Sequence, residues 1–509
     1  MTNLISPAEP RDDLAPGRSS GLDRDTLVVA GVVLLGAIMS ILDTTVVNVA
    51  IDRLAVSFDS SLTTIQWVVT GYTLALAAVI PVSGWASDRF GTKRLYVLSL
   101  VLFTVGSGLS GLAWSAGSLI AFRVLQGLGG GIILPVIITI LTRKAGADRL
   151  GRLMAIVGVP MLIAPVLGPV LGGWLVDDIS WRWMFFVNLP IGVVAIVLAQ
   201  RVLEADAPQP AERLDFTGLL LLSPGLTLMI YGLAESSPYG FGDPRAWLPT
   251  LAGGLLVIAF ALRSWRIAVP LIDLRILVRT RAGAAALVFL LFAISLFGAM
   301  LLIPLYYQSV RHLSALDSGL LLAPLGVGAM LTVPVAGRLS DSHGPSKLPA
   351  AGIPLIILGL VPFAFVTDHT SYVLLGLASF VLGLGNGLCM MPSMTAAMQA
   401  VPEAAIARMS TSMSIVRQVG ASIGTAVLIV ILSARINHDL SGVTGTHGGG
   451  FASLRGLPAE LAAQVERPLA HAFAYSFRWA IVLLMIAFVP ALVTAIRKPV
   501  NASSSEPRA

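Results

Sequence analysis

One acidic side chain stands inside an apolar stretch near the start of the chain. Asp43 lies in residues 42–50, where its neighbours are apolar apart from two threonines and Asn48. An ionisable group inside a membrane-length apolar run is costly, and by default it indicates a functional site. A carboxylate in such a place can bind and release a proton. A residue that only ends a helix among lipid headgroups is the alternative interpretation.

An arginine lies in a second apolar run that is placed to meet Asp43. The runs 27–50 and 118–141 would cross a membrane in opposite directions. Asp43 is about 17 residues into its run and Arg123 about 6 into its own, so a helical rise of about 1.5 Å per residue puts both at similar depth. We expect them to pair, because a buried charge without a partner is expensive. Arg123 stays protonated, so Asp43 is the member that titrates.

The pair can couple proton binding to movement. Contact with Arg123 favours the carboxylate form of Asp43, and separation of the two side chains favours the protonated acid. A conformational change that separates them would therefore bind a proton. A static structural pair is the alternative.

The composition shows which elements must position this pair. The chain is 56% hydrophobic and 12% charged, with mean hydropathy +0.86, whereas soluble chains carry about 25% charged residues. We therefore predict a polytopic membrane protein. The single Cys389 excludes an intrachain disulfide. The polar first residues contain no apolar stretch typical of a signal peptide, and we expect a disordered tail there.

Fourteen spans are predicted, each about 20 residues long. They lie near residues 27–50, 63–83, 95–114, 118–141, 152–176, 183–203, 216–235, 247–265, 282–304, 318–337, 348–366, 371–393, 409–433 and 474–496.

The basic residues orient the spans. If both termini are cytoplasmic, about 23 of the 33 Lys and Arg fall on cytoplasmic segments and about 8 outside, as the positive-inside rule requires. Arg123 and Arg417 lie within spans. The net charge of +6 follows from this placement and is no sign of nucleic-acid binding.

A short charged segment occurs twice, which indicates two related halves. Residues 84–94 and 337–347 match at Gly, Asp and Gly, with every pair 253 positions apart. We predict cytoplasmic loops at both places. The expected organisation is a tail 1–26, a six-helix bundle 27–203, a linker with two inserted spans 204–281, a second six-helix bundle 282–497 with an external loop 434–473 that carries a short helix or hairpin, and a tail 498–509.

These motifs resemble the major facilitator superfamily, and within it the fourteen-span drug:proton antiporters of the EmrB/QacA type. The resemblance covers about 27 to 497. It rests on the segment 84–94, the acid in 42–50, the strings 181–192 and 417–420, and a Gly/Pro series in 152–176. It implies an all-α integral membrane protein with two six-helix bundles and two inserted helices.

The resemblance assigns roles to several residues. Asp43 and Arg123 would couple protons to transport. A gating latch on the inner side would use Gly84, Asp88, Arg89, Gly91, Lys93 and Arg94, with Asp341 in a second copy that is weaker because Ser342 replaces Arg89. A segment that only anchors topology or contacts lipid phosphates is the alternative.

The Gly/Pro series in the fifth span resembles the sequence that marks proton-coupled exporters, where it would seal the cavity or act as a hinge. Close helix packing is the alternative. The series consists of Gly158, Pro160, Pro165, Gly168, Pro169, Gly172 and Gly173.

Amphipathic aromatic, amide and Met side chains are candidates for a loose binding cavity, although packing is the more common role of such residues. The candidates are Asn48, Gln66, Trp67, Tyr72, Gln126, Tyr306, Tyr307, Gln308, Asn386, Met390, Arg417 and Gln418. The late span 409–433 holds no acid, so a site with several carboxylates for dications is not expected.

The predicted function is proton-driven export of amphipathic drugs or toxic compounds across a bacterial cell membrane by alternating access. The expected partners are small amphipathic substrates, protons, membrane lipids and an optional accessory envelope protein, with a monomer and no nucleic acid. No cofactor, metal site or catalytic residue is expected, because the sequence lacks a phosphate-binding Gly-Lys-Ser/Thr loop and metal-ligand spacing. Export of an endogenous metabolite, lipid precursor or siderophore is the alternative. A polytopic membrane enzyme is a second alternative.

Overall fold

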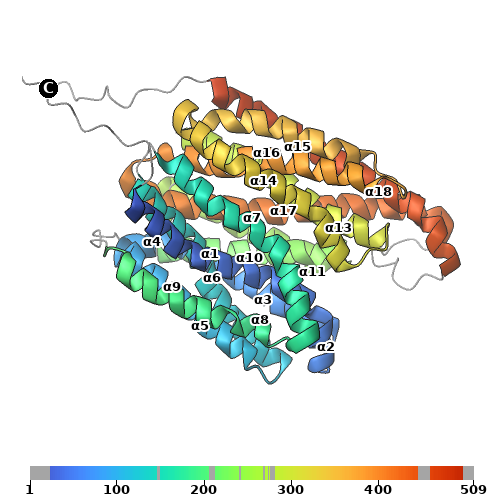
Figure 1. Ribbon diagram of the computed structural model, residues 1–509, viewed down its shortest axis with the longest axis horizontal. Coiled ribbons are helices and arrows are strands. Elements are labelled where there is room, and N and C mark those ends of the chain that lie inside the picture. Colours follow the sequence, from blue (N-terminus) through green and yellow to red (C-terminus); the bar gives the residue numbers. More distant parts are fainter. Residues whose placement is uncertain are drawn as a thin grey trace, which may run out of the picture.

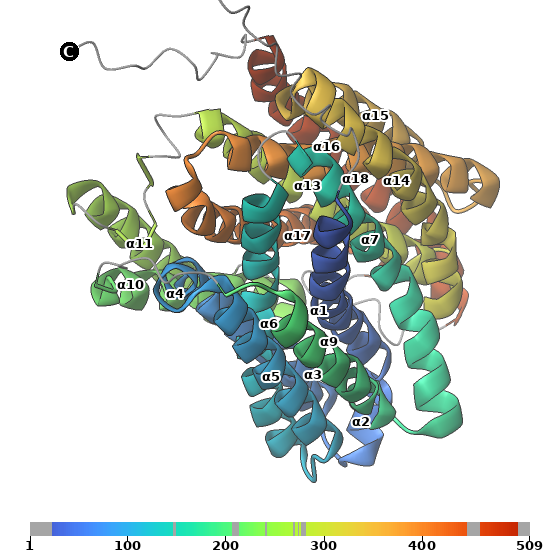
Figure 2. The ribbon, with the colours of Figure 1, turned by 60° about the vertical axis from the view of Figure 1, so that its left-hand side comes forward.

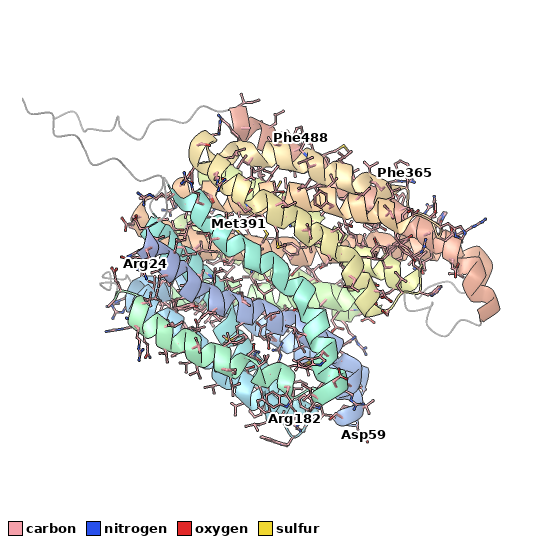
Figure 3. The ribbon with its side chains drawn as sticks, in the orientation of Figure 1. Arg24, Asp59, Arg182, Phe365, Met391 and Phe488 are labelled. Atoms are coloured by element: carbon pink, nitrogen blue, oxygen red, sulfur yellow. The ribbon has the colours of Figure 1, made fainter. Side chains whose placement is uncertain are left out.

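The computed structural model describes residues 23–145, 149–205, 213–239, 242–267, 270–272, 274–275, 281–444 and 459–496. Regular structure in these residues is helical throughout. Helix α1 begins and α18 ends at the same end of the molecule (Figure 1). We call this the terminal end and the opposite one the far end. Figure 3 labels Arg24 at the terminal end and Asp59 and Arg182 at the far end.

Two groups of helices and an intervening pair make up the molecule. The first half comprises α1 (Arg24–Val49), α2 (Ile51–Ser57), α3 (Leu62–Val79), α4 (Val82–Phe90), α5 (Thr92–Gly111), α6 (Ala116–Ala145), α7 (Leu150–Trp174), α8 (Trp183–Phe186) and α9 (Asn188–Val202). The intervening pair is α10 (Phe216–Tyr239) and α11 (Pro244–Arg266). The second half comprises α13 (Arg281–Ser309), α14 (Ala315–His343), α15 (Leu348–Ala364), α16 (Tyr372–Gln399), α17 (Ile406–Thr444) and α18 (Ala459–Ile496).

Twelve of the described helices are long and apolar enough to cross a membrane, or thirteen if α3 and α4, which meet at a 55° bend, form one span. Helices satisfy their own backbone, which a bilayer core without water requires. Large apolar side chains such as Val373 and Val489 point outward, 74% and 63% exposed, as lipid-facing positions do. The predicted span 152–176 corresponds to α7, some of whose side chains lie outside the described residues, so the count of fourteen stays a prediction.

The two halves meet through a few helices. In Figure 1 the first half, blue to green, lies below the second, yellow to red. Helix α7 packs on α1 of its own half and on α14 of the other, and α17 packs on α4 and α6. These helices therefore form the boundary between the halves.

The intervening pair covers one side of that boundary. Helices α10 and α11 lie together beside α4 and α17 (Figure 2), and α10 packs on both α3 and α17. Trp67 of α3 stacks on Tyr231 of α10, with ring centroids 5.6 Å apart. The apolar core of the pair also contacts Trp85 of α4 and Ile415 of α17. The inserted helices thus touch both halves.

The repeated segments are mostly helix, which corrects the predicted loops at 84–94 and 337–347. Helix α4 continues to Phe90 and α14 to His343. Each helix ends at a glycine with positive φ, 84° at Gly91 and 88° at Gly344. These two glycines are equivalent in the repeat, and only a residue without Cβ adopts this conformation readily. The loops are shorter than predicted because no residue before the glycine ends the helix.

The predicted external loop 434–473 is also shorter. Helix α17 continues to Thr444, and α18 begins at Ala459 as a single helix with the last span. The predicted short helix or hairpin in this loop is therefore not a separate element, because residues 459–473 continue directly into the last span. Pro468 lies inside α18 without ending it. Residues 445–458 lie outside the described part of the chain.

Candidate functional site

A buried ion pair connects α1 and α6. Arg123 Nη1 donates to Asp43 Oδ2 at 2.5 Å, and the two side chains are 1% and 0% exposed. The expected contact is confirmed. Its cause is the antiparallel course of two helices whose charged residues occur at the same depth.

Neutral donors complete the surroundings of the carboxylate. Gln126 Nε2 donates to Asp43 Oδ1 at 2.8 Å, and Asn188 Nδ2 donates to the same oxygen at 3.3 Å. Asn188 Nδ2 also donates to Ser107 Oγ at 3.1 Å. We call the side chains of Asp43, Arg123, Gln126 and Asn188 the charge centre. It joins α1, α6 and α9 within the first half.

The arginine of the charge centre is held from its other side too. Its guanidinium carbon lies 4.1 Å from the centre of the Tyr72 ring, a cation–π geometry. Arg123 Nε donates to the backbone oxygen of Val68 at 3.3 Å, and Nη1 to Gln126 Oε1 at 2.9 Å. The guanidinium therefore keeps its place through contacts with α3 and α6, whereas Asp43 comes from α1.

A second set of contacts joins the halves at the terminal end. Asp88 Oδ1 accepts from Arg143 Nη2 at 3.1 Å, and Asp88 Oδ2 lies 3.8 Å from Arg408 Nε of α17. Ser83 and Thr411 hydroxyls are 2.9 Å apart. The sequence interpretation assigned Asp88 and Arg89 together to the latch, and in the structure Arg89 is exposed. Arg408, which the sequence marked only as a topology signal, reaches the acid from the other half.

The second copy of the repeat makes an equivalent contact. Asp341 of α14 accepts from the backbone nitrogen of Gly151 at 2.9 Å and of Arg152 at 3.3 Å, at the start of α7. Arg152 Nε also lies 3.1 Å from Asp341 Oδ2. Each half thus offers one buried acid to the neighbouring half. We call the contacts of Asp88 and Asp341 with their partners, together with the Ser83–Thr411 contact, the terminal gate.

The other basic residues of the predicted latch lie around this gate. Lys93 Nζ donates to the backbone oxygen of Gln200 at 2.7 Å and ties α5 to the end of α9. Arg94 is exposed and borders a surface groove of about 460 Å³ between these helices. A Cβ at Gly84 would come within 2.8 Å of Thr411 Oγ1 and 3.2 Å of the Ala407 oxygen. Close approach of α4 and α17 therefore needs this glycine.

Glycines of α7 allow two different close contacts. A Cβ at Gly158 would lie 3.0 Å from Met391 Cγ and 3.2 Å from Val333 Cγ1 in the second half, and Met391 is labelled beside α7 in Figure 3. A Cβ at Gly168 would overlap Thr45 Oγ1 of α1. Helix α7 therefore packs against the second half near the terminal end and against α1 beyond it. The side chains of Pro160, Pro165 and Pro169 lie outside the described residues.

Comparison with known proteins identifies this architecture. The family model described as Major Facilitator Superfamily matches residues 33–425. The chain belongs to the major facilitator superfamily.

Relatives within this superfamily cover most of the chain. The multidrug resistance protein B homolog of Mycobacterium tuberculosis (strain ATCC 25618 / H37Rv) is 43% identical over 488 residues, which is 92% of this chain and 90% of that protein. The multidrug export protein EmrB of Haemophilus influenzae is 31% identical over 77% of this chain and 78% of its own length. The tetracenomycin C resistance and export protein of Streptomyces glaucescens is 30% identical over 79% and 75%.

Solved structures share the fold. The human organic anion transporter MFSD10 has a TM-score of 0.62 at 13% identity and covers 92% of this chain and 100% of its own. The proton:xylose symporter XylE has a TM-score of 0.59 at 15% identity, with 91% and 95% covered. At such identities the likeness concerns the fold alone.

Several predicted cavity residues of this major facilitator chain are instead packed inside one half. Tyr306 and Tyr307 are fully buried in the core of the second half, and the Tyr306 hydroxyl donates to the Thr367 oxygen at 2.6 Å. Tyr72 and Gln126 are buried at the charge centre. The reason is that an aromatic or amide side chain fills the gap between neighbouring helices as readily as it lines a cavity.

The remaining candidates divide between surface and interior. Gln66 and Gln308 are exposed, and Trp67 contacts α10. Asn386 is buried, and its Oδ1 has no partner among the described residues. Met390, Arg417 and Gln418 are half-buried. The side chain of Asn48 lies outside the described residues.

The sequence interpretation missed four contributors: Ser107, Arg143, Asn188 and Arg408. A signal existed for Asn188, which is an amide in the apolar string 183–192. Arg143 and Arg408 were recognisable as basic residues next to spans, but their contact with Asp88 was not predicted. No group of three or more His, Cys, Asp or Glu that could hold a metal occurs in the described part of the chain.

Proposed function

We propose that this protein is a proton-coupled multidrug efflux transporter that exports amphipathic compounds across a cell membrane by alternating access. The observation that carries the proposal is the charge centre, in which a buried carboxylate is held by a fixed cation from another helix. Support comes from the relatives whose names describe drug resistance or export. Fourteen spans, cytoplasmic termini and a proton gradient as the energy source belong to the same proposal.

The mechanism follows from the chemistry of the charge centre and the gate. While Asp43 is paired with Arg123, the pair is nearly neutral and the carboxylate needs no proton. Binding of a proton from outside weakens the attraction to Arg123 and lets α1 move relative to α6. Opening of the terminal gate then exposes the cavity to the cytoplasm, where the proton leaves and substrate enters.

Asp43→Asn tests the proposal. We expect the variant to be inserted, with lower stability because Arg123 loses its counter-charge, and to lose uphill export, because an amide cannot release a proton. Export is measured in inverted vesicles with an imposed pH gradient, using a fluorescent amphipathic dye. Asp59→Asn is the matched control, since Asp59 lies at the far end in a turn outside the spans.

The variant also distinguishes coupling from binding. Dye exchange down its own gradient should persist in Asp43→Asn, since it requires no net proton movement. Gradient-driven export by the variant at the wild-type rate would refute the assignment of Asp43.

A further inference from the structure

Arg417 carries a charge that the charge centre and the gate leave unused. It lies in α17, whose orientation two contacts define. Ser410 Oγ donates to the Pro135 oxygen of α6 at 2.6 Å. A Cβ at Gly420 would lie 2.9 Å from Ala293 Cβ of α13. One face of α17 therefore packs on α6 of the first half, and an adjacent face packs on α13.

Helical register places Arg417 between these two faces. It follows Ser410 by seven residues, which is about two turns and about 10 Å farther from the terminal end. It precedes Gly420 by three residues, which is nearly one turn. The Arg417 side chain therefore leaves α17 between α6 and α13, on the side that faces the other half and beyond the terminal gate.

The charge of Arg417 has no counterpart in the described part of the chain. The guanidinium is half-buried and stays protonated, and no described residue forms an ion pair or hydrogen bond with it. Other arginines near span ends differ. Arg182 donates to the Gly111 and Ala113 oxygens at 2.8 Å, and Arg478 to the Ala364 oxygen at 3.0 Å. Those side chains support structure, whereas Arg417 makes no such contact with the described residues.

The charges of the buried residues then indicate the sign of the charge on a ligand of Arg417. Asp43 and Arg123 neutralise each other within the first half, so the cation at Arg417 is left over. A fixed cation at a partly dehydrated position attracts carboxylates, sulfonates and phenolates strongly and repels organic cations.

We propose that Arg417 binds the anionic group of the transported compound, so that this transporter prefers amphipathic organic anions and weak acids to organic cations. The proposal rests on the export function proposed above and adds the substrate class. Half-buried Val416 and Met390, which pack on an apolar core that contains residues of both halves, supply apolar surface for the rest of an amphipathic molecule.

The test compares two dyes on the same xanthene frame: fluorescein, an organic anion, and ethyl rhodamine B, an organic cation. In pH-driven vesicles we expect Arg417→Gln to lower fluorescein export about tenfold, the scale of a lost charge-assisted hydrogen bond. Export of ethyl rhodamine B should stay within about twofold. Arg417→Lys should keep most fluorescein export, because it keeps the charge.

Arg435→Gln is the matched control. Arg435 lies 18 residues later, five turns along the same face of α17, where it pairs with Asp439 at 2.9 Å. It should not change the ratio of the two dyes. Fluorescein binding to the purified variants, followed by fluorescence polarisation, separates weaker binding from loss of folded protein.

The outcomes are distinct. Equal loss of both dyes in Arg417→Gln, with normal fluorescein binding, would assign Arg417 a structural role and overturn the proposal. So would a wild-type protein that moves only the cation. Failure of the wild type to move either dye would contradict the export function itself.

Discussion

At the scale of residues, the charge centre combines one carboxylate, that of Asp43, with partners that other helices hold in place. Asp43 accepts from Arg123, Gln126 and Asn188, which come from two other helices. The guanidinium is fixed independently by the Tyr72 ring and the Val68 oxygen. Loss of the contact with Asp43 would therefore leave Arg123 in place. This asymmetry is what the coupling role proposed above requires.

Removing one member of the pair should destabilise the protein more than removing both. We expect Arg123→Gln alone to cost about 3–5 kcal/mol, because it leaves the Asp43 carboxylate buried without a cation. The double variant Asp43→Asn with Arg123→Gln should recover most of that loss, since two amides can bond to each other. Thermal unfolding in detergent measures the difference.

Transport separates the structural from the functional role of this pair. The double variant should be stable and still fail to couple export to a pH gradient. If it transported like the wild type, the pair would be only a structural support. If the double variant were as unstable as Arg123→Gln alone, the unpaired Asp43 carboxylate would not be the cause of the lower stability of the single variant.

At the scale of elements, the sequence predicted what depends on distance along a helix. The contact between Asp43 and Arg123 followed from their depths, since the helical rise is fixed. The contacts of Asn188 with Asp43 and of Arg408 with Asp88 could not be predicted, because they depend on how far each helix is rotated about its axis and on which helices become neighbours. The same limit explains why Tyr307 was predicted to line a cavity although it is buried in the core. A tyrosine in an apolar run can take either place, depending on how its helix is rotated.

The repeated glycines illustrate the other limit. Gly91 and Gly344 were recognised as equivalent, and both have positive φ. The residues before them were predicted as loop because charges cluster there. Charges at the lipid interface do not interrupt a helix, however, so α4 and α14 continue to the glycine.

Helix α7 offers a test with two nearby glycines. Gly168→Ala should strongly lower export, because its Cβ would overlap Thr45 Oγ1 and push α7 away from α1. Gly173→Ala should have little effect, since no atom lies within 4 Å of a Cβ there. Both variants are assayed for dye export and for insertion. Equal activity of the two would mean that the close contact with α1 is not needed for sealing.

At the scale of the whole molecule, the polar contacts between the halves described above lie at the terminal end. Asp88 with Arg408, Asp341 with Gly151 and Ser83 with Thr411 all cross the boundary there. Helices α10 and α11 touch both halves along one side. The structure therefore has its terminal gate closed, and the alternating access proposed above requires this gate to open.

A disulfide across the gate should stop the cycle in this state. The Ser83 and Thr411 hydroxyls lie 2.9 Å apart, so cysteines at both positions are close enough to be bridged. We make Ser83→Cys and Thr411→Cys together in a Cys389→Ser background, because Cys389 is buried and the sequence has no other cysteine. Oxidation should abolish dye export, and a reductant should restore it. Each single cysteine variant should export dye whether oxidised or reduced, which excludes damage by the oxidant. Full cross-linking with undiminished export would show that the terminal ends need not separate, and would refute alternating access through this gate.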